Sequence, residues 1–220
     1  MLPELSQEEI LRYSRHLMMP QVGLTGQKKI KDASALIVGL GGLGSPTSVY
    51  LAAAGLGRIG LVDHDFVDIS GLQRQILYDM NDLGVSKAEI AGKRLRDINP
   101  SIQVDVFNTK FTSENASEIA KDFDILIDGT DNIPTRYLLN DLSVLTSRPY
   151  VYGAVNQFEG QISLFDPRTG PCYRCLFGEP HPLENVPSRT YISVFGITPG
   201  IVGFQWLVVT QQYQVWFRKH

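Results

Sequence analysis

The chain of 220 residues is 43% hydrophobic and 20% charged, and its formal net charge is −3. These values are ordinary for a globular protein, and the slight acidic excess gives no electrostatic reason to expect nucleic acid or an anionic membrane as a partner. Two cysteines argue against a disulfide-built secreted scaffold and fit a reducing cytoplasm. The N-terminus lacks the apolar core of a signal peptide, and no apolar run approaches the roughly 20 residues of a membrane span. We therefore expect a soluble cytoplasmic protein with no membrane or nucleic-acid partner.

The first predicted element is a helical arm over residues 1–30. Ser6 followed by Glu9 forms a capping box, in which each side chain accepts a hydrogen bond from the other residue's backbone N–H. Apolar residues follow at helical spacing, and Pro20 and Gly23 end the helix.

The next segments predict a strand–turn–helix–strand unit. Residues 33–38 form an apolar, β-branched run that leads directly into glycines, and residues 45–54 are small and apolar, as suits a helix packed closely on a sheet. Residues 58–63 form a second short buried strand. This order predicts a βαβ unit with two parallel strands.

The same alternation continues along the chain. Residues 170–190 are rich in glycine, proline and charge and are expected to form a crossover loop, and residues 200–220 form a helix with an apolar face. We therefore predict one domain over 1–220, a doubly wound, Rossmann-like α/β fold with a mainly parallel sheet, an N-terminal helical segment and an antiparallel extension. The remaining helices are expected over 86–99, 112–122 and 133–147, and the remaining strands over 102–107, 123–128, 149–155 and 160–166.

A glycine motif lies between the first strand and the first long helix. Gly39, Gly41 and Gly44 have the spacing G-x-G-x-x-G, and Gly42 is an additional glycine. Such a loop lets backbone N–H groups approach phosphates at a helix N-terminus. Asp63 ends the second strand about 20 residues later, where a carboxylate can bind ribose hydroxyls. The motif predicts nucleotide binding, but it leaves NAD and ATP open.

Charged residues after other strands favour ATP. Arg74, Lys87 and Asp131 lie in loops expected at the carboxyl edge of the parallel sheet, where they can converge on the glycine loop. Two cations near polyphosphate and a carboxylate for Mg²⁺ suit triphosphate chemistry better than hydride transfer. Each has a plainer interpretation, because the cations can be solvated surface charges and Asp131 can cap the helix after it.

Several stretches in order along the chain form a distinctive pattern: RYSRH (12–16), VGLGGLGS (38–45), LVDHDFVDISGLQRQ (61–75), GVSKAE (84–89), INPSI (98–102), DGTDN (128–132), EGQISLF (159–165) and PCYRC (171–175). They resemble the ThiF/MoeB/HesA family of ubiquitin-activating-enzyme-like adenylyltransferases, over about residues 5–203. The resemblance implies that the chain uses ATP and Mg²⁺ to adenylate the C-terminal Gly-Gly carboxylate of a small ubiquitin-like sulfur carrier of the MoaD or ThiS type.

The resemblance also implies roles for single residues. Arg74 and Lys87 bind phosphates, and Asp131 coordinates Mg²⁺ or positions the attack. Arg15 corresponds to an arginine that family members insert into the site of a neighbouring subunit, which implies a homodimer; without the resemblance it is a surface arginine. The residues implied in nucleotide binding are Gly39, Gly41, Gly42, Gly44, Asp63, Asp65, Ser70, Gly71, Arg74, Gln75, Lys87, Asp131 and Asn132.

The two cysteines, Cys172 and Cys175, have the spacing of a metal-binding or redox pair. Their late position resembles the first half of the family's zinc site, which takes four thiolates. The chain has no second pair, so the zinc half-site is incomplete, and His181 is a conceivable third ligand.

Three departures from the family pattern bear on activity. Gly71 stands where the family usually has an asparagine that contacts the nucleotide. Arg189 stands where many members carry a transfer cysteine, so covalent transfer through that loop is not expected. Residues 204–220 fit the family poorly, and together with the missing cysteines they suggest a truncated or altered C-terminus.

Adenylation is the function that these residues favour. The alternative is a non-catalytic module, derived from such an enzyme, that binds a nucleotide or partner; Gly71, Arg189 and the missing cysteines favour it. An NAD-dependent oxidoreductase is a third alternative, but no acid–base group or nicotinamide pocket is evident in the sequence.

Overall fold

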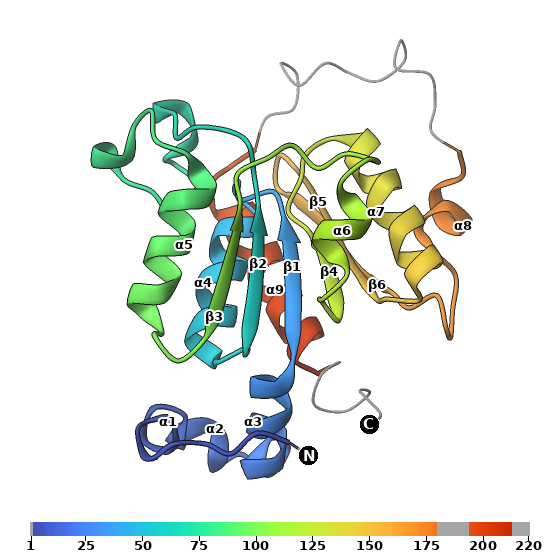
Figure 1. Ribbon diagram of the computed structural model, residues 1–220. Helices are drawn as coiled ribbons and strands as arrows, with labels where there is room; N and C mark the ends of the chain where they lie inside the picture. Colours follow the sequence, from blue (N-terminus) through green and yellow to red (C-terminus); the bar gives the residue numbers. More distant parts are fainter. Residues whose placement is uncertain (1, 180–193, 213–220) are drawn as a thin grey trace.

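A computed structural model of the chain describes residues 2–179 and 194–212. Six strands form one sheet in the order β3-β2-β1-β4-β5-β6 (Figure 1). The strands are β1 (Ser34–Val38), β2 (Arg58–Val62), β3 (Gln103–Phe107), β4 (Ile125–Asp128), β5 (Tyr150–Asn156) and β6 (Glu159–Phe165). The helices are α1 (Gln7–Arg12), α2 (Ser14–Leu17), α3 (Gly23–Asp32), α4 (Gly44–Ala54), α5 (Lys87–Ile98), α6 (Ala116–Ala120), α7 (Ile133–Thr146), α8 (Tyr173–Phe177) and α9 (Ile197–Gln212), with short 3-10 helices η1 (Ile69–Gly71) and η2 (Met80–Asp82).

The pairing of the strands confirms the predicted fold class. Strands β1 to β5 pair in parallel, and β6 pairs antiparallel to β5 from Tyr150 opposite Phe165 to Asn156 opposite Glu159. The strand order reverses between β1 and β4, so the chain continues from these strands to helices on opposite faces of the sheet, α4 and α7, and leaves a crevice. In doubly wound sheets this is where ligands bind.

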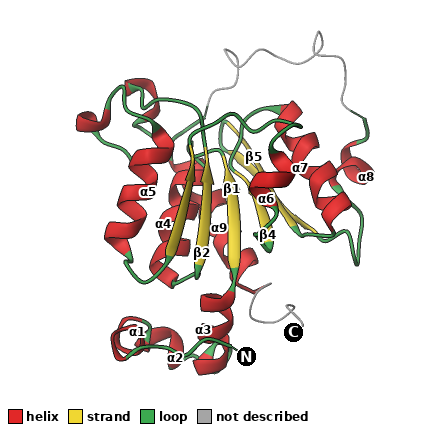
Figure 2. Ribbon diagram, viewed as in Figure 1, coloured by secondary structure: helices red, strands yellow, loops and turns green. Residues whose placement is uncertain are grey.

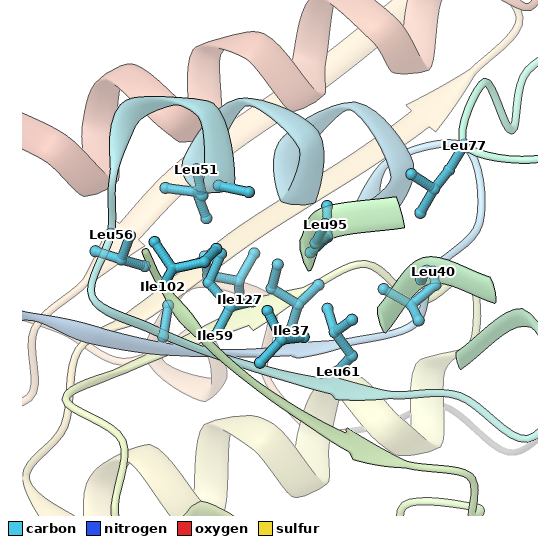
Figure 3. Close-up of a cluster of buried hydrophobic side chains, with 14 of the residues drawn as sticks. Ile37, Leu40, Leu51, Leu56, Ile59, Leu61, Leu77, Leu95, Ile102 and Ile127 are labelled. Carbon is cyan, nitrogen blue, oxygen red and sulfur yellow. The ribbon is translucent and has the colours of Figure 1, made fainter. Parts of the chain in front are cut away.

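Helices cover both faces of the sheet and enclose two hydrophobic cores (Figure 2). On one face Leu51 of α4 and Leu95 of α5 pack against Ile37, Ile59 and Ile127, all of them fully buried (Figure 3). The other face is covered by α6, α7 and α8. Alternate residues of the central strands pack into the two cores, one on each face of the sheet. Because both faces are buried, these strands are continuous apolar runs.

Helix α4 has no distinct polar face, and eight of its eleven residues are buried. It contacts α5 and α9 as well as β1, so little of its surface reaches water. Each large apolar side chain buried in such a layer stabilises the fold by about 1.5–3 kcal/mol. The helix is therefore held firmly against the sheet, and its N-terminus has a fixed position at the crevice.

The N-terminal arm begins with the predicted capping box, because Ser6 and Glu9 cap α1 reciprocally. The expected single helix is nevertheless wrong, since it breaks at Tyr13 into α1 and α2. Tyr13 is buried, and its hydroxyl accepts a hydrogen bond of 2.9 Å from the side chain of Asn99. The arm leads through α3 into the amino end of β1, so it lies at the end of the sheet opposite the crevice (Figure 1).

Three further expectations differ from the structure. Helix α6 spans only Ala116–Ala120, because the Asn115 side chain accepts the Thr112 N–H and forms a turn in place of the first helical turn. The expected loop after residue 170 contains α8, whose Tyr173 is buried among aromatic rings. Helix α9 begins at Ile197, earlier than expected. None of the helices in the described ranges is long and apolar enough to span a bilayer.

Backbones approach closely where β1 and β4 end. Gly39 adopts φ +91°, and a Cβ added to it would lie 2.7 Å from the Gly129 carbonyl carbon. A Cβ on Gly44 or on Gly129 would lie 2.0 Å from the Gly39 carbonyl oxygen. The third glycine of the motif, Gly44, thus permits close packing of α4 on the strand, and Gly129 is a further required glycine that the motif did not reveal.

We expect Gly129→Ala to destabilise the fold by about 1–3 kcal/mol, because its methyl group would collide with backbone and not with a movable side chain. Gly200→Ala is the matched control, since a Cβ at Gly200 meets nothing within 4 Å and alanine favours a helix. Thermal and urea unfolding of both variants measure the difference. Equal stability of the two variants would contradict the packing argument.

Candidate functional site

A cavity of about 850 Å³ lies at the carboxyl ends of β1, β2 and β4. This volume is within the range of small-molecule sites, about 300–1,000 Å³. Of the residues predicted to bind a nucleotide, all but Gly44 line the cavity, whereas Gly44 is buried at the start of α4. The predicted residues that line it are Gly39, Gly41, Gly42, Asp63, Asp65, Ser70, Gly71, Arg74, Gln75, Lys87, Asp131 and Asn132.

The glycine loop presents bare backbone to this cavity. A Cβ on Gly41 would approach only the Gln75 amide nitrogen, at 3.9 Å, and one on Gly42 would approach Arg74 and Pro199, at 3.2 Å. The following helix, α4, has no side-chain cap at its N-terminus. Uncapped N–H groups and the positive end of the helix dipole favour an anion at this point. The residues present therefore fit a phosphate-bearing ligand.

Asp63 holds the glycine loop in addition to lining the cavity. Its Oδ2 accepts the Leu40 N–H at 2.7 Å, and its Oδ1 accepts the Asp65 N–H at 2.8 Å. The Leu40 carbonyl accepts from the Tyr78 hydroxyl at 3.0 Å and from the Ser45 hydroxyl at 3.1 Å. Burial raises the pKa of Tyr78, so this phenol remains a donor at neutral pH. Sequence reasoning found Asp63 but missed Tyr78, which no motif marks.

Two cations lie beside the glycine loop. Lys87 is only 8% exposed, so it is not the solvated surface charge of the plainer interpretation. Its Nζ lies 3.2 Å from Asp65 Oδ2. Arg74 is half-buried and donates to the Ser70 carbonyl at 3.0 Å. Both positive charges therefore line the same cavity as the glycine loop.

Asp131 lines the cavity from the end of β4 and is exposed. It does not cap the next helix, because Asn132 takes that position and accepts the Thr135 N–H at 2.9 Å. The plainer interpretation of Asp131 is therefore wrong. Its carboxylate comes directly before the start of α7, at the edge of the cavity.

Asp63, His64 and Asp65 form a possible metal-ligand group. One ligand atom from each lies within 4.8 Å of the others, and no second group of three such residues occurs in the described ranges. Asp65 also faces Lys87, and Asp63 accepts two backbone N–H groups. These contacts already compensate much of the negative charge, so the group gives no strong indication of a cation.

Some lining residues were missed by sequence reasoning. Thr109, Lys110 and Phe111 follow β3 and reach the cavity edge. These three residues could have been predicted in the same way as Asp131, because β3 ends at the same edge of the sheet as β4. Val194 and Pro199 line the cavity from the side of α9, and no sequence pattern predicted that this segment would reach the cavity.

Gly71 is buried below the Gln75 side chain. A Cβ at Gly71 would lie 2.8 Å from the Gln75 amide carbon and oxygen, so this side chain occupies the space that the missing side chain leaves. Gln75 is 6% exposed, and its Oε1 has no hydrogen-bond partner among the described residues. An unsatisfied buried acceptor that lines a cavity is suited to accept a donor from a ligand.

Arg15 is not brought to this cavity. It is exposed in α2, at the opposite end of the sheet from the residues that line the site (Figure 1). The arginine therefore cannot serve the cavity of its own chain in this conformation.

The two cysteines lie together at the start of α8, with their Sγ atoms 3.6 Å apart. Two thiolates bound to one tetrahedral zinc ion at 2.3 Å would be separated by about 3.8 Å, so the pair has suitable spacing. Helix α8 is fixed to α7 because Arg174 donates twice to Asp141, at 2.8 Å each. No third His, Cys or acidic ligand joins the pair in the described part of the chain. His181 and Arg189 lie outside the described residues.

The fold and site define a doubly wound nucleotide-binding protein. The sequence pattern of the ThiF family matches residues 13–215, and the chain belongs to this family. The matched range reaches into the segment 204–220, for which we expected a poor fit.

Among curated relatives, the chain is 48% identical over 203 residues to the sulfur carrier protein adenylyltransferase of Thermus thermophilus, covering 90% of this chain and 75% of that protein. It is 51% identical over 200 residues to a probable molybdopterin-synthase adenylyltransferase of Porphyra purpurea, covering 90% of this chain but 52% of the relative. The chain thus spans only part of these proteins. A crystal structure of E. coli MccB matches with a TM-score of 0.84 at 22% identity, over 98% of this chain and 65% of that chain, which supports the fold.

We expect Lys87→Ala to weaken binding of ATP by roughly 10- to 100-fold, because a hydrogen bond to a charged group contributes about 1.5–3 kcal/mol. Lys93→Ala is the matched control, since Lys93 lies on the same helix, is 73% exposed and pairs with Asp97. Isothermal titration calorimetry with ATP and Mg²⁺ measures both. An equal loss in the two variants would show that only the general charge of α5 matters.

Proposed function

We propose that the chain adenylates the C-terminal Gly-Gly carboxylate of a small ubiquitin-like sulfur-carrier protein, with ATP as the second substrate. The observation that carries the proposal is the identity of 48% over 90% of the chain to a sulfur carrier protein adenylyltransferase. The cavity supports it, because bare glycine backbone, two cations and Asp131 surround one space.

The reaction requires positioning more than proton transfer. A carboxylate oxygen of the carrier attacks the α-phosphorus of ATP, a new P–O bond forms, and the bond to the β-phosphate oxygen breaks. Pyrophosphate leaves, and the carrier keeps the AMP as an acyl-adenylate. The attacking carboxylate is already ionised at neutral pH, so no general base is needed. The protein then contributes by aligning the reactants and stabilising negative charge.

The residues of the cavity divide this work by position. Lys87 and Arg74 bind phosphate oxygens beside the glycine loop and stabilise the charge that develops on pyrophosphate. Asp63 is placed to accept from ribose hydroxyls, because each of its oxygens can accept a second hydrogen bond. Gln75 offers its buried Oε1 to a donor of the nucleotide or carrier, in compensation for the side chain absent at Gly71.

Asp131 is the proposed ligand for Mg²⁺. Its exposed carboxylate lines the same cavity as the two cations and is a hard oxygen donor of the kind that Mg²⁺ prefers. The ion, when bound, would supply positive charge that neutralises the phosphate oxygens. By holding a cation there, Asp131 also lessens its own repulsion of the incoming carrier carboxylate.

The cysteine pair is proposed as half of a zinc site, in a protein of the cytoplasm. Cys172 and Cys175 are free thiols in the described structure, and Cys175 is exposed, which suits a reducing cytoplasm. They provide two of the four ligands of a structural zinc site, so zinc binding needs two further ligands from outside the described residues. Adenylation itself requires no thiol.

Arg15 is proposed to act in the site of a second copy. The residue is exposed on α2 and separated from its own cavity by the length of the sheet. In a homodimer with composite sites, Arg15 would reach the phosphates bound in the partner's cavity. A two-fold arrangement would place one copy of Arg15 at each of the two sites.

The alternative function is a non-catalytic module that binds a nucleotide or a partner. Gly71 favours it, because a nucleotide contact of the family is missing there. The joint presence of Arg74, Lys87 and Asp131 around one cavity opposes it, because a module that only binds does not need this full set of charged groups.

ATP–pyrophosphate exchange tests the proposed reaction. We expect exchange that depends on both Mg²⁺ and a carrier ending in Gly-Gly, and a loss of at least about 100-fold in Asp131→Ala, the order that one removed electrostatic stabiliser can cost. Binding of ATP without exchange, for carriers of both the MoaD and ThiS types, would support the module instead.

Mixing two inactive variants tests the composite site. Arg15→Ala and Asp131→Ala are each expected to be inactive alone, because every site lacks one group. In a mixed dimer one site carries both changes and the other carries neither, so random subunit exchange should restore about a quarter of the wild-type rate. The measurement is exchange activity after mixing and incubation. No recovery despite demonstrated subunit exchange would place Arg15 outside the reaction.

A further inference from the structure

A buried carboxylate lies directly below the cavity and has no part in the steps above. Asp128 is the last residue of β4, in the centre of the sheet, and is fully buried. It does not line the cavity, but the next three residues, Gly129, Thr130 and Asp131, all do. The carboxylate is thus placed behind the wall that carries Asp131.

Three hydrogen bonds connect Asp128 to its surroundings. Its Oδ1 accepts the Thr130 N–H at 2.9 Å and the Thr130 hydroxyl at 2.6 Å. Its Oδ2 accepts the hydroxyl of Tyr150, a fully buried residue of β5, at 2.7 Å. The carboxylate therefore fixes the turn after β4 on one side and is itself fixed to the neighbouring strand on the other.

Arg136 holds the same turn from the other side. Its Nη2 donates to the Thr130 carbonyl at 3.3 Å, and its Nε lies 3.8 Å from Asp128 Oδ2. The guanidinium lies over the Tyr152 ring, 5.4 Å from the centroid, which limits its movement. Both the N–H and the carbonyl of Thr130 are thus bound by charged groups that the protein itself buries.

Asp131 is confined between two fixed residues as a result. Thr130 before it is held at its N–H, hydroxyl and carbonyl, and Asn132 after it caps α7. The backbone at Asp131 therefore has little freedom, although the side chain is exposed to the cavity. A carboxylate that aligns a metal or a nucleophile benefits from such a fixed base.

Stability alone does not explain this arrangement. Burial raises the pKa of Asp128 although Arg136, Thr130 and Tyr150 act to lower it. The Arg136 Nε is buried without a hydrogen-bond partner among the described residues, so the ion pair is not fully satisfied. Replacing a buried ion pair by apolar groups is often neutral or stabilising. What the pair provides here is a defined position for the turn.

We propose that Asp128 is a positioning residue for the adenylation reaction and acts through Thr130 to hold Asp131 in its productive place. The inference rests on the proposed function, because Asp131 must take part in the reaction for its position to matter. Asp128 touches neither the nucleotide nor the carrier, and Arg136 supports it from α7.

The first test is Asp128→Asn, which keeps the shape but removes the charge that strengthens these hydrogen bonds. We expect kcat for ATP–pyrophosphate exchange to fall roughly 10- to 100-fold, the scale of a misplaced catalytic group, while the Kd for ATP changes less than about twofold. In an Asp131→Asn background the same change should have almost no further effect on kcat, because the two residues act in one chain of contacts. An equal fold-loss in both backgrounds would overturn the proposal.

Asp124→Asn is the matched control. Asp124 precedes the same strand and accepts the N–H and hydroxyl of Ser34, at 2.8 Å each, in the way that Asp128 accepts those of Thr130, but at the far end of the sheet. We expect its kcat to equal that of the wild type. A loss of kcat as large as in Asp128→Asn would assign the effect to general stability and overturn the proposal.

A second pair of variants applies if Asp128→Asn does not fold. Thr130→Val removes the hydroxyl that donates to Asp128, and Thr130→Ser keeps it. We expect kcat to fall in the valine variant and to be retained in the serine variant; equal rates in the two would overturn the proposal. Absence of exchange in the wild type itself would instead contradict the proposed function, so the two failures are distinguishable.

Discussion

The architecture depends on one close contact between backbones, where the loop that follows β1 meets the loop that follows β4. Gly39 and Gly129 approach so closely that neither position has room for a Cβ. Gly44 brings the first turn of α4 against the carbonyl of Gly39. This contact sets the distance between the two walls of the cavity, one formed by the glycine loop and the other by residues 129–132. The geometry available to a ligand is therefore decided by backbone packing before any side chain contributes.

Each of these walls is held by a carboxylate at a strand end. Asp63, after β2, accepts the N–H of Leu40 in the glycine loop. Asp128, at the end of β4, accepts the N–H and hydroxyl of Thr130 in the facing wall. Hydrogen bonds to an ionised acceptor are about twice as strong as neutral ones, so both loops are fixed more firmly than irregular backbone usually is. The cost is two carboxylates that are largely removed from water.

Sequence reasoning succeeded where chemistry is local. The capping box at Ser6 predicted the start of α1, the alternation of apolar runs predicted parallel strands, and the glycine spacing predicted the loop that lines the cavity. Other lining residues, such as Ser70 and Gln75, were implied only by the family resemblance. It failed for Tyr78 and Thr130, because their roles arise from contacts with residues far along the chain or with backbone whose path is set by the fold.

The N-terminal arm shows the same limit at larger scale. Its helices were predicted, but its place at the end of the sheet away from the cavity follows from the tertiary structure alone (Figure 1). No local pattern indicates at which end of the sheet a residue of the arm will lie.

The proposed chemistry explains why a site of this kind consists of fixed backbone and cations, with no activated base. A carboxylate nucleophile needs no proton removed, and pyrophosphate leaves without being protonated by the protein when cations neutralise it. Rate then depends on how well the carrier carboxylate, the α-phosphate and the cations are aligned, and misplacement by about 1 Å can cost 100-fold. Because the rate depends on alignment, the nucleotide contact that is missing at Gly71 is tolerable if the two walls of the cavity keep their spacing. The loss of Asp63 or Asp128, the carboxylates that hold the two walls, is not tolerable, because it would release the loops that set the alignment.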